Sequence, residues 1–249
     1  MLLALALACT DPQTLSVTAT DPFGTAMEEV TVKLATGEPY LTGKDGQVSF
    51  DVPSGKLEIM VGKDGFIPEF GVVNVPDEGD PDALAFTLFF EPDHVGFYGV
   101  SRSDYTELVT EKIKTVATEK TTWHGLKDVP KHALPSGMPQ RFVFQSSLRA
   151  SELKQQNLTL SKLKFVEEAE VVGVLGPIEV ELDLWVADTD LDFDIKGTQA
   201  QDNYLIVTKT ALEPGFYAFH AQSILKSTQA ESLDRLPKEM QVAFPFEVK

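Results

Sequence analysis

Short segments of alternating apolar and polar residues most constrain the fold of this 249-residue chain. Leu15, Val17 and Ala19 alternate with polar residues, and the same pattern returns over 48–52 and 57–61. Successive side chains of a β-strand point to opposite faces, so this alternation predicts strands with one buried face. Turn residues separate the segments at intervals of roughly 8–12 residues, which is typical of an antiparallel β-sandwich.

The C-terminal part of the chain repeats this pattern. Apolar residues alternate with acidic residues and a tryptophan over 178–186, and a further alternating segment, 242–248, closes the chain. Helical spacing is found only over 150–156 and 229–236. The sequence therefore predicts an all-β chain with one or two short helices, which lie in its C-terminal part.

A domain boundary is expected near Glu91-Pro92-Asp93-His94, because proline cannot continue the ladder of a central strand. At about 100–200 residues per domain, the length of the chain fits two domains. We predict two β-sandwich-like domains in tandem, residues 14–92 and 93–249. Residues 1–13 then form a signal segment and a short tether.

Composition limits the classes of partner. Hydrophobic residues make up 43% of the chain and include 16 Phe, which suffices for packed cores, and a single cysteine excludes an intramolecular disulfide. The formal net charge of −17 argues against nucleic acid as a partner, because phosphate binding needs clustered Lys and Arg. It also argues against broad electrostatic contact with anionic lipid.

The turns and strands of the N-terminal part follow a recognisable order. A Val-x-Val-x-Leu segment at 30–34 precedes Lys-Asp-Gly-Gln-Val-Ser-Phe at 44–50, Pro-Ser-Gly-Lys-Leu-Glu-Ile-Met-Val at 53–61 and Asp-Gly-Phe at 64–66. This order resembles the carboxypeptidase regulatory-like, transthyretin-related β-sandwich over about residues 14–90. The resemblance implies a module without an active site of its own, which serves as a spacer or adhesion-like unit in exported proteins.

The only cysteine, Cys9, follows the apolar run Met1-Leu-Leu-Ala-Leu-Ala-Leu-Ala8 and precedes polar residues. This arrangement resembles the lipobox of bacterial lipoproteins, in which the preceding peptide is removed and the cysteine is acylated. The resemblance implies a lipid anchor at Cys9 and a place in the bacterial cell envelope. Thr10 is not the Asp that signals retention in the inner membrane, so the outer membrane is expected. A secretory signal without acylation and a cytosolic chain are the alternatives.

Motifs of known catalytic chemistry are missing from the sequence. It contains no His-Glu-x-x-His, no phosphate-binding Gly-x-x-x-x-Gly-Lys, no Gly-x-Ser-x-Gly and no dinucleotide fingerprint. We therefore predict no catalytic residues, no metal and no cofactor.

One segment near the middle of the C-terminal part carries a row of acidic residues. Asp188, Asp190, Asp192 and Asp194 stand at every second position, which on an extended strand puts four carboxylates on one face. They are then too far apart to share one ion, so we expect a solvated acidic row. A bend in this segment would allow a calcium site instead.

The stretch 123–141 contains three prolines and no clear periodicity, and is predicted to be a long loop. Trp123 in this loop is a candidate anchor for a partner, or covers the edge of the core. His124 and His132 are expected to be surface residues of the same loop.

These features predict a non-enzymatic envelope lipoprotein that acts as a binding, adhesion or scaffolding module. It is attached to the membrane through its lipid anchor and contacts a protein or glycan partner. The alternative is a carbohydrate-binding or hydrolytic domain in residues 93–249. In that case acidic residues such as Asp183, Asp188 or Asp190 serve as general acid and base, because paired carboxylates can hydrolyse glycosides.

Overall fold

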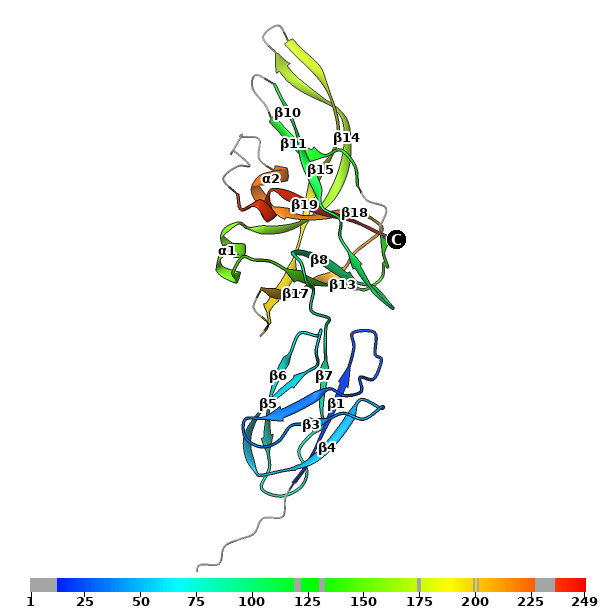
Figure 1. The fold of residues 1–249 in the computed structure, drawn as a ribbon. Helices are drawn as coiled ribbons and strands as arrows, with labels where there is room; N and C mark the ends of the chain where they lie inside the picture. The colour runs from blue at the N-terminus through cyan, green and yellow to red at the C-terminus, as the bar shows by residue number, and fades with distance from the viewer. Residues whose placement is uncertain are drawn as a thin grey trace, which may run out of the picture. The chain divides into compact units, whose positions relative to one another are not determined.

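The described part of the chain is all-β, as the alternating segments predict, and contains two short α-helices (Figure 1). The computed structural model describes residues 13–118, 122–129, 133–173, 176–198, 200, 202–226 and 236–249. The chain folds into two compact units, and the boundary between them lies between Glu91 and Pro92. The first unit contains Met1–Glu91 and the short segment Thr198–Gln201, and the second contains Pro92–Gly197 and Asp202–Lys249.

The first unit is a sandwich of two sheets. β1 is central in the smaller sheet and pairs antiparallel with β4 and parallel with β7. This sheet contains β4 (Gln47–Val52), β1 (Gln13–Thr20) and β7 (Leu84–Thr87). The other sheet contains, in spatial order, β3 (Tyr40–Leu41), β2 (Thr31–Leu34), β5 (Gly55–Gly62) and β6 (Glu69–Val75). Buried side chains from both sheets form one core, as period-two burial requires.

The turn before β4 is formed by residues 44–46. Gly46 has φ +71°, a conformation that favours glycine, and a Cβ there would lie 2.5 Å from the carbonyl oxygen of Ala19. The carboxylate of Asp45 accepts a hydrogen bond from the backbone N–H of Gln47 at 3.0 Å. Sequence and packing therefore specify the same turn.

The second unit contains a seven-stranded and a five-stranded sheet. In the larger sheet β10 also pairs with β19, so its first six strands form a closed ring of pairings. The spatial order is β10 (Glu111–Ala117), β11 (Thr122–Leu126), β15 (Gly176–Leu191), β14 (Leu158–Gly173), β18 (Gly215–Ala221), β19 (Val242–Val248) and β12 (Ala133–Leu134). The smaller sheet contains β16 (Phe193–Gly197), β17 (Asn203–Ala211), β13 (Pro139–Gln145), β8 (Gly96–Val100) and β9 (Tyr105–Glu107).

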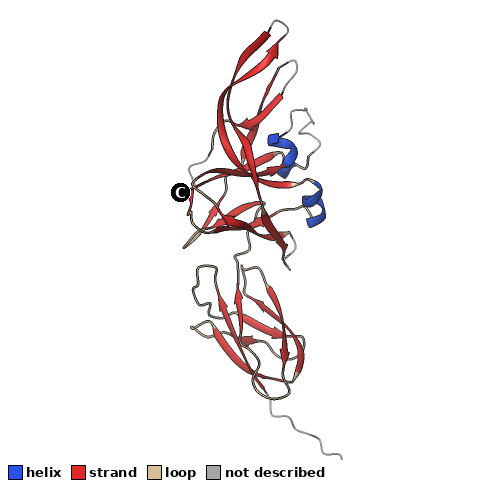
Figure 2. Cartoon of the chain, turned by 180° about the vertical axis from the view of Figure 1, so that it is seen from behind, coloured by secondary structure: helices blue, strands red, loops and turns tan. Residues whose placement is uncertain are grey.

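Both described α-helices lie in the second unit (Figure 2). α1 (Ala150–Gln155) confirms the helix predicted at 150–156, and its buried Leu153 joins the core. α2 (Gln222–Lys226) follows β18 directly and was not predicted, because five residues are too few for a visible helical period. A 3₁₀ turn, Lys238–Met240, precedes β19. Most of the predicted helix at 229–236 lies outside the described residues.

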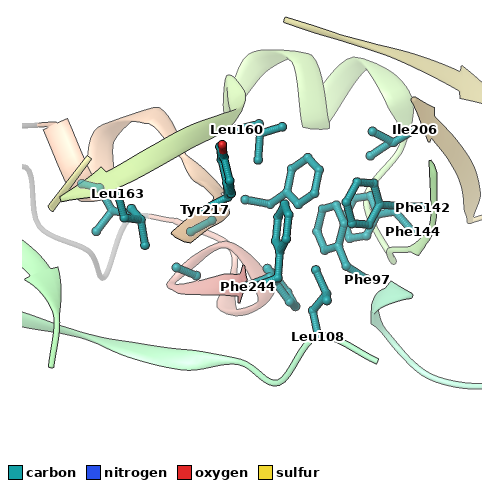
Figure 3. Close-up of a cluster of buried hydrophobic side chains, with 14 of the residues drawn as sticks. Phe97, Leu108, Phe142, Phe144, Leu160, Leu163, Ile206, Tyr217 and Phe244 are labelled. Carbon is teal, nitrogen blue, oxygen red and sulfur yellow. The ribbon is translucent and has the colours of Figure 1, made fainter. Parts of the chain in front are cut away.

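A group of stacked phenylalanines fills the core of the second unit (Figure 3). The Phe97 ring from β8 is fully buried and stacks on Phe144 from β13 at a centroid distance of 3.9 Å. It also stacks on Phe219 from β18 at 4.4 Å, which joins the two sheets. Apolar burial of these large rings is the main source of the unit's stability.

β14 and β15 form a long antiparallel hairpin, which extends beyond β18 and β19 (Figure 1). The register shifts twice along it, between Lys162 and Leu163 and between Val166 and Glu168. Asp183 lies at the second shift with φ +45°, a backbone conformation that is uncommon outside glycine. These bulges bend the hairpin where it leaves the sheet.

Candidate functional site

Two of the residues singled out from the sequence, Cys9 and His132, lie outside the described residues. Among the residues that the structure does describe, no helix is long and apolar enough to span a membrane.

The four aspartates at 188–194 do not form one row, in contrast to the expected face of carboxylates. The shift in pairing after Lys162 leaves Asp188 without an opposite residue on β14. Its carboxylate lies 2.8 Å from the ammonium group of Lys164, and this hydrogen bond lowers the pKa of Asp188. Asp190 instead accepts a hydrogen bond from Ser161, and Ser161 and Lys164 lie on opposite faces of β14.

The last two aspartates belong to different surroundings. Asp192 stands between β15 and β16, and Asp194 lies in β16, 3.9 Å from the ammonium group of Lys209. No group of three or more His, Cys, Asp or Glu side chains converges as a metal site within the described residues. The bulge therefore separates side chains that the spacing alone placed together.

Trp123 and His124 lie in strand β11, not in the predicted loop. Trp123 is half-buried and is not one of the side chains packed against the main core of its unit. His124 is only 6% exposed, so the expectation of a surface histidine was wrong. Its Nδ1 lies 2.8 Å from the hydroxyl oxygen of Thr115 on β10, and burial lowers the pKa of His124. Prolines and glycines later in the segment concealed this five-residue strand.

A polar network around two buried side chains joins three strands of the larger sheet. The Ser161 hydroxyl on β14 donates to Oδ1 of Asp190 on β15 at 2.7 Å, and its oxygen lies 2.9 Å from Nε2 of His220 on β18. Nδ1 of His220 lies 2.8 Å from the carbonyl oxygen of Ala221. Ser161 and His220 are 0% and 1% exposed. No local sequence pattern indicates this group, because its members are up to 59 residues apart.

The network has the residue types of a nucleophilic triad in a different order. In a triad the acid orients the histidine, whereas here Asp190 binds the serine and the far nitrogen of His220 faces a backbone carbonyl. All three bonds can form together only if both ring nitrogens carry protons, because the carboxylate and the carbonyl are acceptors. The arrangement is suited to holding β14, β15 and β18 together through side-chain hydrogen bonds.

A second group sits on the surface near the start of the second unit. His94 lies between two carboxylates, with Nδ1 2.6 Å from Asp93 and Nε2 3.0 Å from Glu107. The hydrogen bond to Asp93, followed by the one to Glu107, raises the pKa of His94. The same hydrogen bond lowers the pKa of Asp93. Burial raises the pKa of the neighbouring Tyr98 to about 12.

Three aromatic side chains form a partly exposed row across neighbouring strands of the larger sheet. Phe165 on β14 stands opposite Trp185 on β15, and their ring centroids are 5.4 Å apart. Trp185 in turn lies 4.6 Å from the ring of Phe216 on β18. Phe165 is 44% exposed, and the other two rings are half-buried. We call Phe165, Trp185 and Phe216 the aromatic row.

A largely apolar groove of about 440 Å³ lies between α1 and the β16–β17 edge of the smaller sheet. Phe193, Ile195 and Gly197 line it from alternate positions of β16, and Leu153 lines it from α1. Lys154 is the only charged side chain in its lining. The volume falls in the range of small-ligand sites.

Comparison with known proteins assigns no family. No family model and no curated protein matches the chain. Among solved structures it is similar to a DUF3823 family protein from Parabacteroides merdae, with 14% identity, 96% of this chain and 100% of the other covered, and a TM-score of 0.24.

Two further similar structures come from Bacteroides species. One is a candidate membrane-associated protein of unknown function from Bacteroides fragilis, with 9% identity, 80% and 96% of the two chains covered, and a TM-score of 0.26. The other is a candidate carbohydrate-binding protein from Bacteroides uniformis, with 8% identity, coverage of 84% and 87%, and a TM-score of 0.20. TM-scores this low establish neither a shared fold nor a shared function for this chain.

Proposed function

We propose that the protein is a non-enzymatic, lipid-anchored binding module of the bacterial envelope, held at the outer membrane through Cys9. The first unit acts as a carboxypeptidase regulatory-like spacer, and the second unit carries the binding surface. The observation that carries this proposal is the aromatic row, which leaves Phe165 44% exposed beside two half-buried rings. Aromatic side chains are concentrated where proteins bind their partners.

The aromatic row favours a glycan as the ligand. The faces of aromatic rings carry partial negative charge, and the C–H bonds of a sugar ring carry partial positive charge, so the two stack in water. Strand pairing holds Phe165 and Trp185 opposite one another, so little freedom is lost on binding.

The spacer role of the first unit rests on its sequence resemblance and on its own construction. Its two sheets enclose a single apolar core. Gly46 and Gly55 both adopt positive φ in the turns where the resemblance places glycines. A filled sandwich of this kind holds a neighbouring unit at a distance from an anchor.

Lipid attachment is tested by mass spectrometry of the native protein and by membrane fractionation. We expect acyl groups on Cys9 as the first residue, and a Cys9→Ser variant that leaves the membrane fraction. An unmodified Cys9 in the native protein would remove the anchor from this proposal.

The binding role is tested by Trp185 fluorescence in a Trp123→Phe background, titrated with a panel of soluble polysaccharides. We expect at least one polysaccharide to change the emission, and Phe165→Ala to weaken that affinity by about tenfold or more. Phe70→Ala is the matched control, because Phe70 in the first unit is 51% exposed. No response to any polysaccharide, or an unchanged affinity in Phe165→Ala, would overturn the glycan assignment.

The same titration separates binding from hydrolysis. The release of new reducing ends, abolished by Asp190→Asn, would favour the hydrolytic alternative. Binding without release supports the non-enzymatic role.

A further inference from the structure

β16 is an edge strand of the five-stranded sheet. It pairs with β17 on one side, and no other described strand pairs with it on the other side. Ile195 at its centre is 43% exposed, and the Asp194 side chain is 79% exposed. An open edge with an exposed apolar residue is a template for pairing with another chain.

The hydrogen bonds to β17 define which backbone groups of β16 point outwards. Lys209 N–H donates to the carbonyl oxygen of Asp192 at 3.1 Å, one step before β16 begins. Hydrogen-bonded pairs recur at every second residue of an antiparallel ladder. Asp194 and Lys196 therefore direct their backbone groups towards β17.

The backbone groups of Phe193, Ile195 and Gly197 consequently point to the open edge. These three residues, at alternate positions of β16, also line the apolar groove. A strand that paired with this edge would meet the outward N–H and C=O groups of these three residues. It would also cover the exposed side chain of Ile195.

We propose that a second copy of this chain occupies this edge, through antiparallel pairing of β16 with β16 about a two-fold axis at Ile195. The five-residue sequence Phe-Asp-Ile-Lys-Gly is complementary to itself in that register. Asp194 stands opposite Lys196 of the second copy, and Lys196 opposite Asp194. Ile195 meets its own equivalent, and Phe193 meets Gly197.

This register agrees with both the backbone and the side chains. With the two-fold axis at Ile195, the Ile195 residues of the two copies form a hydrogen-bonded pair. Phe193 and Gly197 of opposite copies then form hydrogen-bonded pairs too, so their outward backbone groups are also satisfied. Asp194 and Lys196 then form the non-hydrogen-bonded pairs, in which side chains lie closest. The contact is isologous and closes as a dimer.

Charge complementarity distinguishes this edge from the edge formed by β6. β6 is the edge strand of the four-stranded sheet of the first unit, and its Val72 is 54% exposed. Its only charged residue is Glu69, so antiparallel self-pairing about Val72 brings no opposite charges together. β6 therefore supplies a control surface with similar exposure and no predicted pairing.

The proposal is tested by sedimentation equilibrium of the full chain carrying Cys9→Ser, which prevents acylation. We expect a concentration-dependent dimer with a Kd of about 100 µM or tighter. Asp194→Lys and Lys196→Asp, each alone, replace two attractive contacts by two repulsive ones, and should weaken the dimer by about tenfold or more. The double variant exchanges the charges and should restore dimerisation.

The double variant also controls for local effects within one copy. Like Asp194→Lys alone, it places a lysine near Lys209, so a recovered dimer shows that this local repulsion is not what weakens the single variant. Ile195→Lys should abolish the dimer, whereas Val72→Lys should leave it unchanged. A chain that stays monomeric up to about 500 µM would overturn the proposal. So would single charge variants that dimerise normally, or a double variant that fails to recover.

Discussion

Replacing Ser161 with alanine removes the hydroxyl that links β14 to β15 and β18. His220 is 1% exposed, so the hydrogen bond between its Nε2 and the serine is lost in a place that water does not reach. A hydrogen bond contributes about 0.5–1.5 kcal/mol between neutral groups and about 1.5–3 kcal/mol where one group is charged. Asp190 is exposed, so water replaces the serine at its carboxylate at little cost. We therefore expect Ser161→Ala to lower the free energy of unfolding of the second unit by about 1–3 kcal/mol.

Tryptophan fluorescence during urea unfolding measures this loss directly. Both tryptophans of the chain, Trp123 and Trp185, lie in the second unit, so their emission follows that unit alone. Ser147→Ala provides the control in the same unit. Ser147 is exposed and donates to Glu239 at 3.0 Å, so its loss should cost less than about 0.5 kcal/mol.

The comparison of the two serines decides whether burial gives the network its strength. If Ser161→Ala proves as mild as Ser147→Ala, the hydroxyl does not clamp the three strands. A folded Ser161→Ala with an unchanged urea slope but a lower midpoint is the expected result, because only stability changes.

Two further perturbations test the core and the surface histidine. Phe97→Ala should lower the free energy of unfolding by about 3–5 kcal/mol in the same urea assay, because it opens a cavity against Phe144 in a fully buried stack. A loss below about 1 kcal/mol would contradict this packing. NMR titration should give His94 a pKa above the ordinary value of 6.5, with Glu107→Gln moving it back towards that value. Because the folded pKa is raised, the stabilisation from His94 is complete below the unfolded pKa and is lost as pH rises through the folded one. A titration at or below 6.5 in the parent would refute the contacts with Asp93 and Glu107.

The local alternation of residues determined the strands, and the structure confirms the all-β class. The segment 242–248 is β19, and the predicted strand at 178–186 lies within β15. The turn at Lys44-Asp45-Gly46 also follows from the sequence, because the positive φ of Gly46 is a local requirement. The strands beside this turn, β3 and β4, belong to different sheets, so the hairpin that such a turn favours does not form. Such features depend on residues close together in the chain, so a sequence reports them.

Tertiary structure alone decided which strands became neighbours. Alternation states which face of a strand is buried, but it does not name the strand beside it. Ser161, His220 and Asp190 meet only because β14 pairs with β15 on one side and β18 on the other. The same pairing brings Phe165 and Trp185 together, whereas one bulge at Asp188 divides carboxylates that the sequence spacing aligned. Long-range pairing and register therefore created the candidate site, while composition and period defined the strands that carry it.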